Sequence, residues 1–206
     1  MSAGGSAPAV AGLLLAAGAG RRMGGPKALL REPDGTAWVT RTARTLLDAG
    51  CAPVLVVVGA EAAEVAALLP ASVVAVRAED WAEGMGASLR AGLAALAATL
   101  PGQRTPVAAV VALVDTPGVG AEVVARLAAL GSPEALARAA YAGRPGHPVL
   151  IGRGHWDGVA VLARGDAGAR DYLAGHEVTL VECGDIGDGR DVDRPVDLGT
   201  GPRLGS

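Results

Sequence analysis

Four short apolar runs alternate with alanine-rich stretches, and this alternation restricts the possible folds more than any other feature of the chain. The runs lack the polar–apolar alternation of a half-exposed strand, so both faces of each strand are expected to be buried. The runs are Ala9 to Leu15, Pro53 to Val58, Val73 to Val76 and Val107 to Val114. The stretches between and after them have helical spacing and are Thr36 to Ala49, Glu61 to Leu69, Ala87 to Leu100 and Gly120 to Leu130. This order predicts a doubly wound α/β fold whose ligands bind beyond the carboxyl ends of the strands.

The last third of the chain has a less regular pattern. Within residues 133–163, PEALARAAYAG has helical composition, whereas GRPGHPVLIG contains turn residues followed by a predicted strand. Beyond it, GDAGARDYL predicts a short helix and HEVTLVEC a strand, followed by the acidic, glycine-rich loop GDIGDGRDVDRPVDL. Because no linker or internal repeat interrupts the pattern, residues 1–206 are expected to form a single domain, with residues 1–9 as a disordered lead-in.

Composition and charge exclude several classes of protein. A chain of 206 residues can bury a core without disulfides or a structural metal, and Cys51 and Cys183 lack any partner motif, which indicates buried thiols of a reducing compartment. The net charge of −3 argues against coating of nucleic acid. Apolar runs such as VAGLLLAA have eight residues, far fewer than the roughly 20 of a membrane span, and the N-terminus lacks the basic region of an export signal. We therefore expect a cytoplasmic protein without nucleic-acid or membrane partners.

A glycine-rich loop, AAGAGRRMGGPKALL, follows the first predicted strand. Its glycines allow backbone amides to turn inward, an arrangement that suits a polyphosphate; they are Gly18, Gly20, Gly24 and Gly25. Arg22 and Lys27 add positive charge, and Lys27 is the only lysine among 18 lysines and arginines. The alternative is a merely flexible loop that contains a lysine by chance.

Two common phosphate-binding loops do not fit this segment. The dinucleotide fingerprint that starts at Gly18 requires glycine where Met23 stands. The P-loop pattern fails because Pro26 intervenes and Ala28 replaces the magnesium-binding hydroxyl. The loop must therefore be of another kind.

Carboxylates follow two of the predicted strands. Asp115 comes directly after the fourth run, at the sheet edge that also carries the glycine loop, and a divalent cation such as Mg²⁺ would reconcile its charge with bound phosphates. The alternative role for Asp115 is a helix N-cap. The acidic loop fails the calcium template and contains Asp185, Asp188, Asp191 and Asp193. It is either a solvated turn with Pro195 in the first turn of a helix, or one of its carboxylates completes the metal site.

Other candidate residues are weaker. Gly84 and Gly86 precede a helix with Ser88 in its first turn, where amides could hold a base edge or a phosphate. Ser88 does not fit a nucleophile elbow, because Arg90 stands where that motif needs glycine. His147 precedes a proline and suits a structural role, and the three histidines have no zinc-site spacing.

Taken together, these segments resemble the molybdenum cofactor nucleotidyltransferases, which are MobA-like NTP transferases. The resemblance covers Val10 to Leu198 and rests on LLLAAGAGRRMGGPKALL, EGMGASLRAGL, LVDTPG, GRPGHPVLIG, GDAGAR and DVDRPVDL. GHPVL and GDAGAR are similar to the MocA-like cytidylyltransferase branch. The resemblance implies a Rossmann-like three-layer α/β/α sandwich with a mostly parallel sheet. It also implies Mg²⁺-dependent transfer of a nucleoside monophosphate from an NTP to the terminal phosphate of molybdopterin, with release of pyrophosphate and a molybdoenzyme as recipient of the product.

The resemblance also assigns roles to residues. Arg22 and Lys27 would neutralise the triphosphate, Asp115 and Asp191 would bind Mg²⁺, and His147 and Asp166 would contact the acceptor. The nucleotide-binding set would be Ala16, Ala17, Gly18, Gly20, Gly24, Gly84 and Ser88. An Ala-Ala-Gly loop is similar to that of CTP users, so CTP is favoured over GTP. Arg194 stands where the family often has threonine, which leaves the role of Asp193 open.

Two other functions remain compatible with the sequence. The protein could transfer a nucleotide to another phosphorylated acceptor, such as a sugar phosphate, because the glycine loop contacts the triphosphate and not the acceptor. It could also be a catalytically silent protein that binds a nucleotide or delivers a cofactor, although Lys27 and Asp115 favour an enzyme.

Overall fold

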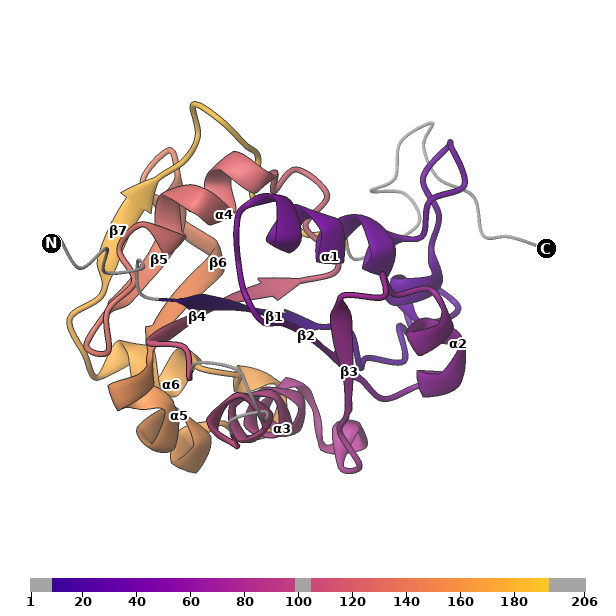
Figure 1. The fold of residues 1–206 in the computed structure, drawn as a ribbon, viewed down its shortest axis with the longest axis horizontal. Coiled ribbons are helices and arrows are strands. Elements are labelled where there is room, and N and C mark those ends of the chain that lie inside the picture. Colours follow the sequence, from indigo (N-terminus) through magenta and orange to yellow (C-terminus); the bar gives the residue numbers. More distant parts are fainter. Residues whose placement is uncertain (1–8, 99–104, 193–206) are drawn as a thin grey trace, which may run out of the picture.

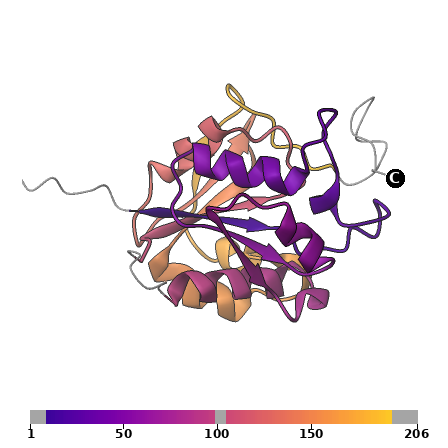
Figure 2. The same cartoon turned by 45° about the vertical axis from the view of Figure 1, so that its right-hand side comes forward.

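The computed structural model describes residues 9–98 and 105–192, which form a seven-stranded sheet with helices on both faces (Figures 1 and 2). The strands are β1 (Val10–Leu15), β2 (Val54–Val58), β3 (Val73–Arg77), β4 (Ala108–Leu113), β5 (Leu136–Tyr141), β6 (Arg144–Gly152) and β7 (Thr179–Glu182). The α-helices are α1 (Trp38–Asp48), α2 (Ala62–Ala67), α3 (Met85–Ala97), α4 (Ala121–Ala128), α5 (Trp156–Leu162) and α6 (Arg170–Ala174).

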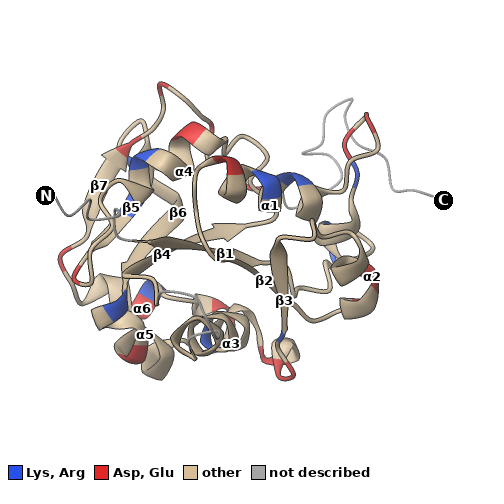
Figure 3. Cartoon of the chain, viewed as in Figure 1, with Lys and Arg blue, Asp and Glu red and all other residues tan. Residues whose placement is uncertain are grey.

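The strand order is β3-β2-β1-β4-β6-β5-β7, and most neighbours are parallel. β1 pairs in parallel with β2 and β4, β2 with β3, and β5 with β7, whereas β6 is antiparallel to both β4 and β5. The residues of β2 and β4 are buried throughout, as the unalternated apolar runs predict. For β3 that prediction is wrong, because β3 is the edge strand of the sheet and none of its residues is fully buried. β1, β2 and β4 carry no charged residue, and most charged side chains lie on helices and in loops (Figure 3). The mostly parallel α/β sandwich is confirmed.

Two hydrophobic cores lie on opposite faces of the sheet. α1 and α4 cover one face (Figure 1) with buried residues such as Trp38 and Leu127. α3, α5 and α6 cover the other, where Leu93 and Trp156 are buried. A Cβ on Gly92 of α3 would lie 2.6 Å from Leu13 Cδ1, so only glycine allows α3 to pack this closely on β1. This packing holds the N-terminus of α3 near the carboxyl edge of the sheet.

The segment PEALARAAYAG forms strand β5, although its composition suggests a helix. β5 pairs with β6 on one side and β7 on the other, and its small residues Ala137 and Ala139 are buried in the core beneath α1 and α4. Ala142 and Gly143, both with positive φ, form the two-residue turn into β6, as is typical of tight hairpins. Pairing on both edges therefore overrides the helical propensity of alanine and leucine.

Several expectations have direct outcomes. Cys51 and Cys183 are buried, free thiols. Across residues 9–98 and 105–192, no helix has the length and apolar character that a bilayer crossing requires. The predicted helix near Asp193 and Pro195, and most of the predicted lead-in, lie outside the described residues.

Candidate active site

The loop after β1 folds back on itself at Gly20. The carbonyl of Gly20, which has φ +57°, accepts hydrogen bonds from the N–H groups of Met23 at 2.8 Å and Gly25 at 3.3 Å. A Cβ on Gly20 would collide with the Gly25 carbonyl, so this turn requires glycine. The buried Met23 side chain anchors the loop, which then enters a short 3-10 helix, Lys27–Leu29.

Lys27 and Asp115 meet at the carboxyl edge of the sheet. Lys27 Nζ donates to Asp115 Oδ2 at 2.7 Å, and both side chains are largely buried. The other carboxylate oxygen, Asp115 Oδ1, is buried and has no hydrogen-bond partner within residues 9–98 and 105–192. Asp115 does not cap the following helix, because α4 begins six residues later with Gly120 at its N-cap. Its place in the fold therefore suits a ligand rather than a cap.

A cavity of about 390 Å³ lies against this ion pair, within the usual size range of small-molecule sites. Predicted site residues that line it are Ala16, Ala17, Gly18, Gly20, Lys27, Gly84, Ser88, Asp115 and Asp166. Arg21 also lines it, whereas the exposed residues Arg22 and Gly24 do not. The part played by Arg22 therefore stays a prediction, and Arg21 is a cation that the sequence pattern did not single out.

The wall opposite the glycine loop is held in place by close backbone packing. A Cβ on Gly84, which has φ +119°, would lie 2.6 Å from Asp166 Oδ1, so Gly84 lets Asp166 approach the start of α3. Arg90 of α3 donates to the Ala163 carbonyl at 2.6 Å and to Glu83 at 2.8 Å. These contacts fix the N-terminus of α3, with its unsatisfied amides, beside Asp166.

The acidic loop after β7, described as far as residue 192 and called the acidic tail below, runs alongside Asp115. The N–H of Val192 donates to the backbone carbonyl of Asp115 at 2.9 Å, and Asp188 N–H donates to Gly118 at 3.1 Å. Asp191, next to Val192, is thereby brought to the carboxyl edge of β4.

The other two described carboxylates of the tail have arginine partners. Asp185 accepts two hydrogen bonds from Arg126, which lower its pKa, and Asp188 binds Arg190, which lowers its pKa in the same way. Asp193 lies outside the described residues. Asp191 directly precedes Val192, whose N–H bonds to the Asp115 backbone, and of the described tail carboxylates it therefore lies nearest in sequence to that contact.

These residues fit a divalent ion that arrives with a nucleotide. Asp115 Oδ1 is a buried oxygen with no hydrogen-bond partner among the described residues, and Asp191 lies in the segment that bonds to the Asp115 backbone. Within the described ranges no three His, Cys, Asp or Glu side chains form a ready metal cage. Mg²⁺-type ions commonly use one or two carboxylates and complete their coordination with phosphates and water.

His147 lies on β6, beside the Asp115 end of β4. Burial lowers the pKa of His147 to about 4; the charge of Arg138 also lowers it, and that of Asp115 raises it. The imidazole is therefore neutral near pH 7. The hydroxyl of Tyr141 donates to the His147 carbonyl at 2.8 Å and braces the hairpin. His155 and His176 instead pack around Tyr172, away from this edge of the sheet.

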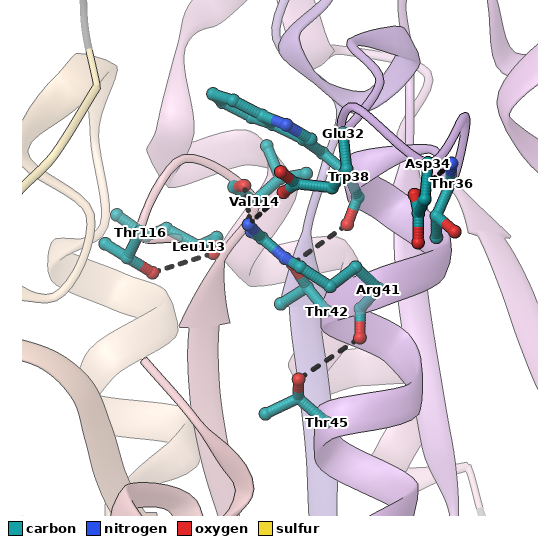
Figure 4. A network of polar contacts seen from close by, with 10 residues as sticks. All are labelled: Glu32, Asp34, Thr36, Trp38, Arg41, Thr42, Thr45, Leu113, Val114 and Thr116. Atoms are coloured by element: carbon teal, nitrogen blue, oxygen red, sulfur yellow. Dashed lines mark hydrogen bonds and ion pairs between the residues drawn. The ribbon is translucent and has the colours of Figure 1, made fainter. Parts of the chain in front are cut away.

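A polar network supports Asp115 from the α1 side of the sheet (Figure 4). Arg41 of α1 donates to the Val114 carbonyl at 3.3 Å and to Glu32 at 2.7 Å. Burial lowers the pKa of Arg41, although Glu32 opposes this. Its guanidinium carbon also lies 5.5 Å from the centre of the Trp38 ring. In sequence, Arg41 looks like any exposed helix arginine, so no pattern could have identified this contact.

Comparison with known proteins gives consistent matches. Residues 12–180 match the family model described as the MobA-like NTP transferase domain. The chain is 42% identical over 199 residues to nicotine blue oxidoreductase of Paenarthrobacter nicotinovorans, covering 90% of this chain and 93% of that protein.

Two solved mycobacterial structures are also similar. One, from Mycobacterium sp. strain JC1, is a homologue of the Mycobacterium tuberculosis protein Rv0371c; it is 31% identical, with a TM-score of 0.76 and coverage of 91% and 92% of the two chains. The other is Rv0371c from M. tuberculosis H37Rv in complex with manganese; it is 26% identical, with a TM-score of 0.67 and coverage of 86% and 89%.

Proposed function

The chain belongs to the MobA-like NTP transferase family, and on this premise we propose that it transfers a nucleoside monophosphate to the terminal phosphate of molybdopterin and releases pyrophosphate. The observation that carries the proposal is the Lys27–Asp115 pair at the cavity beside the glycine loop. It sets an ammonium for the phosphates next to a carboxylate whose second oxygen has no partner in the part of the chain that the structure describes. We place the reaction in the cytoplasm, in keeping with the two free thiols.

The reaction needs no covalent enzyme intermediate. A phosphate oxygen of the acceptor attacks the α-phosphorus, and the bond from that phosphorus to the bridging oxygen breaks on the opposite side. Lys27, the loop amides and the arginines at positions 21 and 22 receive the negative charge of the leaving pyrophosphate. Catalysis is then mainly positioning and charge stabilisation.

A divalent cation bound with the nucleotide, Mg²⁺ or Mn²⁺, would offset the repulsion between carboxylate and phosphates. Asp115 and Asp191 are the residues that would hold it. The manganese complex of the mycobacterial relative supports a divalent ion without selecting magnesium.

We propose CTP as the preferred nucleotide, ahead of GTP. Ala16 and Ala17 line the cavity directly after β1, at the positions where the loop resembles that of cytidylyltransferases. Ser88 and the start of α3 face them as candidate contacts for the nucleotide.

A second candidate function is oxidation or reduction of nicotine blue or a related compound. The 42% identity to nicotine blue oxidoreductase, over nearly the full length of both chains, favours it. The glycine loop lacks the dinucleotide fingerprint, because Met23 occupies a required glycine position.

One set of assays separates these functions. The protein is incubated with each of the four NTPs, with Mg²⁺ or Mn²⁺, and with molybdopterin or a sugar phosphate, and released pyrophosphate is measured. A parallel reaction contains reduced nicotinamide dinucleotide and nicotine blue. Pyrophosphate release that needs CTP and molybdopterin supports the proposal. Release only with a sugar phosphate would instead identify the sugar phosphate as the acceptor. Oxidation of the dinucleotide without pyrophosphate release favours the reductase, and no turnover in any mixture favours a silent binder.

A further inference from the structure

Arg138 of β5 differs from every other half-buried arginine in residues 9–98 and 105–192. There are four of these, and three have a carboxylate partner: Arg41 pairs with Glu32, Arg90 with Glu83 and Arg126 with Asp185. Arg138 instead donates through Nε and Nη2 to one carbonyl, that of Gly146, at 3.2 and 3.1 Å. Burying a guanidinium without an acid costs free energy, so an anionic ligand would be stabilising there.

The contact between Arg138 and the Gly146 carbonyl places the guanidinium beside His147, the next residue along β6. Arg138 lies opposite Val149 of β6, and Leu136 and Val149 both belong to the core beneath α3, α5 and α6. Because side chains alternate along a strand, Arg138, two residues after Leu136, faces that side. The β5–β6 pairing shifts register beyond Arg138, and there the guanidinium bonds to the carbonyl of Gly146, the residue directly before His147. Both Arg138 and Asp115 influence the pKa of His147, so the imidazole is within electrostatic range of each.

This pair lies on the far side of Asp115 from the glycine loop. The strand order β1-β4-β6-β5 puts the loop after β1, Asp115 after β4 and Arg138 on β5. Three strand spacings separate β1 from β5, about 14 Å in all. Neither Arg138 nor His147 lines the cavity beside the loop, so a ligand bound to them would occupy a neighbouring position.

We propose that Arg138 and the imidazole of His147 bind the phosphate of the acceptor, a phosphate monoester. This inference rests on the proposed nucleotidyl transfer. A guanidinium can bind a phosphate through two parallel N–H groups, and the Nη1 group of Arg138 donates to no residue that the structure describes. An acceptor held there approaches the α-phosphorus near Asp115 from one side, while pyrophosphate leaves towards Lys27 and the glycine loop on the other.

The alternative is a structural Arg138 that only holds the Gly146 carbonyl and the β5–β6 hairpin. Arg138→Gln removes the charge, and Arg138→Lys keeps it. Arg144→Gln is the matched control, because Arg144 lies exposed at the turn of the same hairpin.

The first measurement uses inorganic phosphate as the probe and does not depend on turnover. The chain has three histidines, so their ring signals can be followed by nuclear magnetic resonance at one fixed pH and assigned with a His147→Gln variant. We expect phosphate to shift the His147 signal in the wild type, in Arg138→Lys and in Arg144→Gln, and about tenfold more phosphate to be needed in Arg138→Gln. Equal phosphate affinity in Arg138→Gln and the wild type would overturn the proposal.

The second measurement is steady-state kinetics with CTP and molybdopterin. Arg138→Gln should raise the KM for molybdopterin about tenfold and leave the KM for CTP unchanged, with partial recovery in Arg138→Lys. A parallel rise in both KM values, or no recovery by lysine, would assign Arg138 a structural role and refute the inference. If the wild type releases no pyrophosphate with any NTP, the proposed function fails, and the phosphate titration alone then decides whether this anion site exists.

Discussion

Two ion pairs in this protein have nearly the same geometry and very different surroundings. The shortest nitrogen–oxygen distance is 2.7 Å both in Lys27–Asp115 and in Arg126–Asp185. The side chains of the first pair are 15% and 19% exposed, and those of the second 37% and 60%. Arg126 satisfies both oxygens of Asp185, whereas Asp115 Oδ1 has no partner.

Under the proposed function, this difference separates a functional ion pair from a structural one. The outer pair is complete and joins α4 to the loop after β7, where solvent weakens its contribution to stability. The inner pair leaves a buried oxygen unsatisfied, which costs about 1–3 kcal/mol. Stability alone does not account for such an arrangement, whereas the proposed cation bound with the nucleotide would. On this proposal, the incomplete contact, rather than the short distance, distinguishes the active site.

Removing the carboxylate charge should produce the largest difference in reaction rate between the Lys27–Asp115 pair and the Arg126–Asp185 pair. Asp115→Asn should lower pyrophosphate release by more than about 10²-fold, because a charge contact at the reacting phosphates is lost. Asp185→Asn is the matched control and should leave the rate within about twofold. Initial rates of the two folded variants test this, and near-normal release from Asp115→Asn would contradict the assignment.

The cations form the second comparison. Lys27→Ala should lower the rate about 10²-fold, because the leaving pyrophosphate loses its ammonium partner. Arg126→Ala should leave the rate unchanged. Equal losses in the two variants, at saturating CTP, would show that the inner pair serves folding and not catalysis.

A third pair, Arg41–Glu32, is intermediate in burial, with side chains 22% and 26% exposed. Arg41 touches the Val114 carbonyl and not the cavity, so it acts as a positioning residue for Asp115. We expect Arg41→Ala to lower kcat about tenfold with little change in the KM for CTP. Arg44→Ala, an exposed position on the same helix, is the control. A rise in KM at constant kcat would instead indicate a direct role in nucleotide binding.

The two regions should also differ in their response to acid. Burial lowers the folded-state pKa of His147 from 6.5 to about 4, so the unfolded chain binds a proton between these pH values that the folded chain does not. Stability should therefore fall as the pH drops through this window. Thermal melts should show a decrease in Tm between pH 6.5 and 4 that is about 5 °C larger for the wild type than for His147→Gln. Parallel curves would mean that His147 is solvated.

The outer pair should give the smallest effect. Arg126 lowers the pKa of Asp185, so the pair stabilises the fold at pH 7 and loses this contribution as the pH falls below the ordinary value of 3.8. Arg126→Ala should lower Tm by about 2 °C at pH 7. The difference should shrink below pH 3.8 and in high salt. A difference that persists in acid would point to packing of the Arg126 stem instead.

The sequence predicts the parallel strands β1, β2 and β4 well, because buried strands have unbroken apolar runs. It also predicts strand β3, although not its exposure, because the apolar run does not show that β3 lies at the sheet edge. It also predicts that the glycine loop and Asp115 share one edge, since the carboxyl ends of parallel strands converge there. It does not predict β5, where alanines favour a helix in isolation and only the pairing partners β6 and β7 determine a strand.

The side-chain contacts of the site are less accessible to sequence reasoning. Whether position 21 or 22 faces the cavity depends on the turn at Gly20, and both positions are arginine. The acidic tail contains several equivalent aspartates, and partners far away in the chain distinguish them. Arg126, 59 residues before Asp185, occupies one of these carboxylates. Periodicity and local motifs do not predict such long-range contacts.

The hydrogen bond from Val192 to Asp115 has a consequence for biosynthesis. Val192 follows Lys27 by 165 residues, so a ribosome that adds about 5–20 residues per second needs about 8–30 s to travel from one to the other. Throughout that interval the emerging polypeptide already carries the glycine loop but lacks the segment that borders Asp115. Translation must therefore pass Val192 before a nascent chain can assemble the whole site.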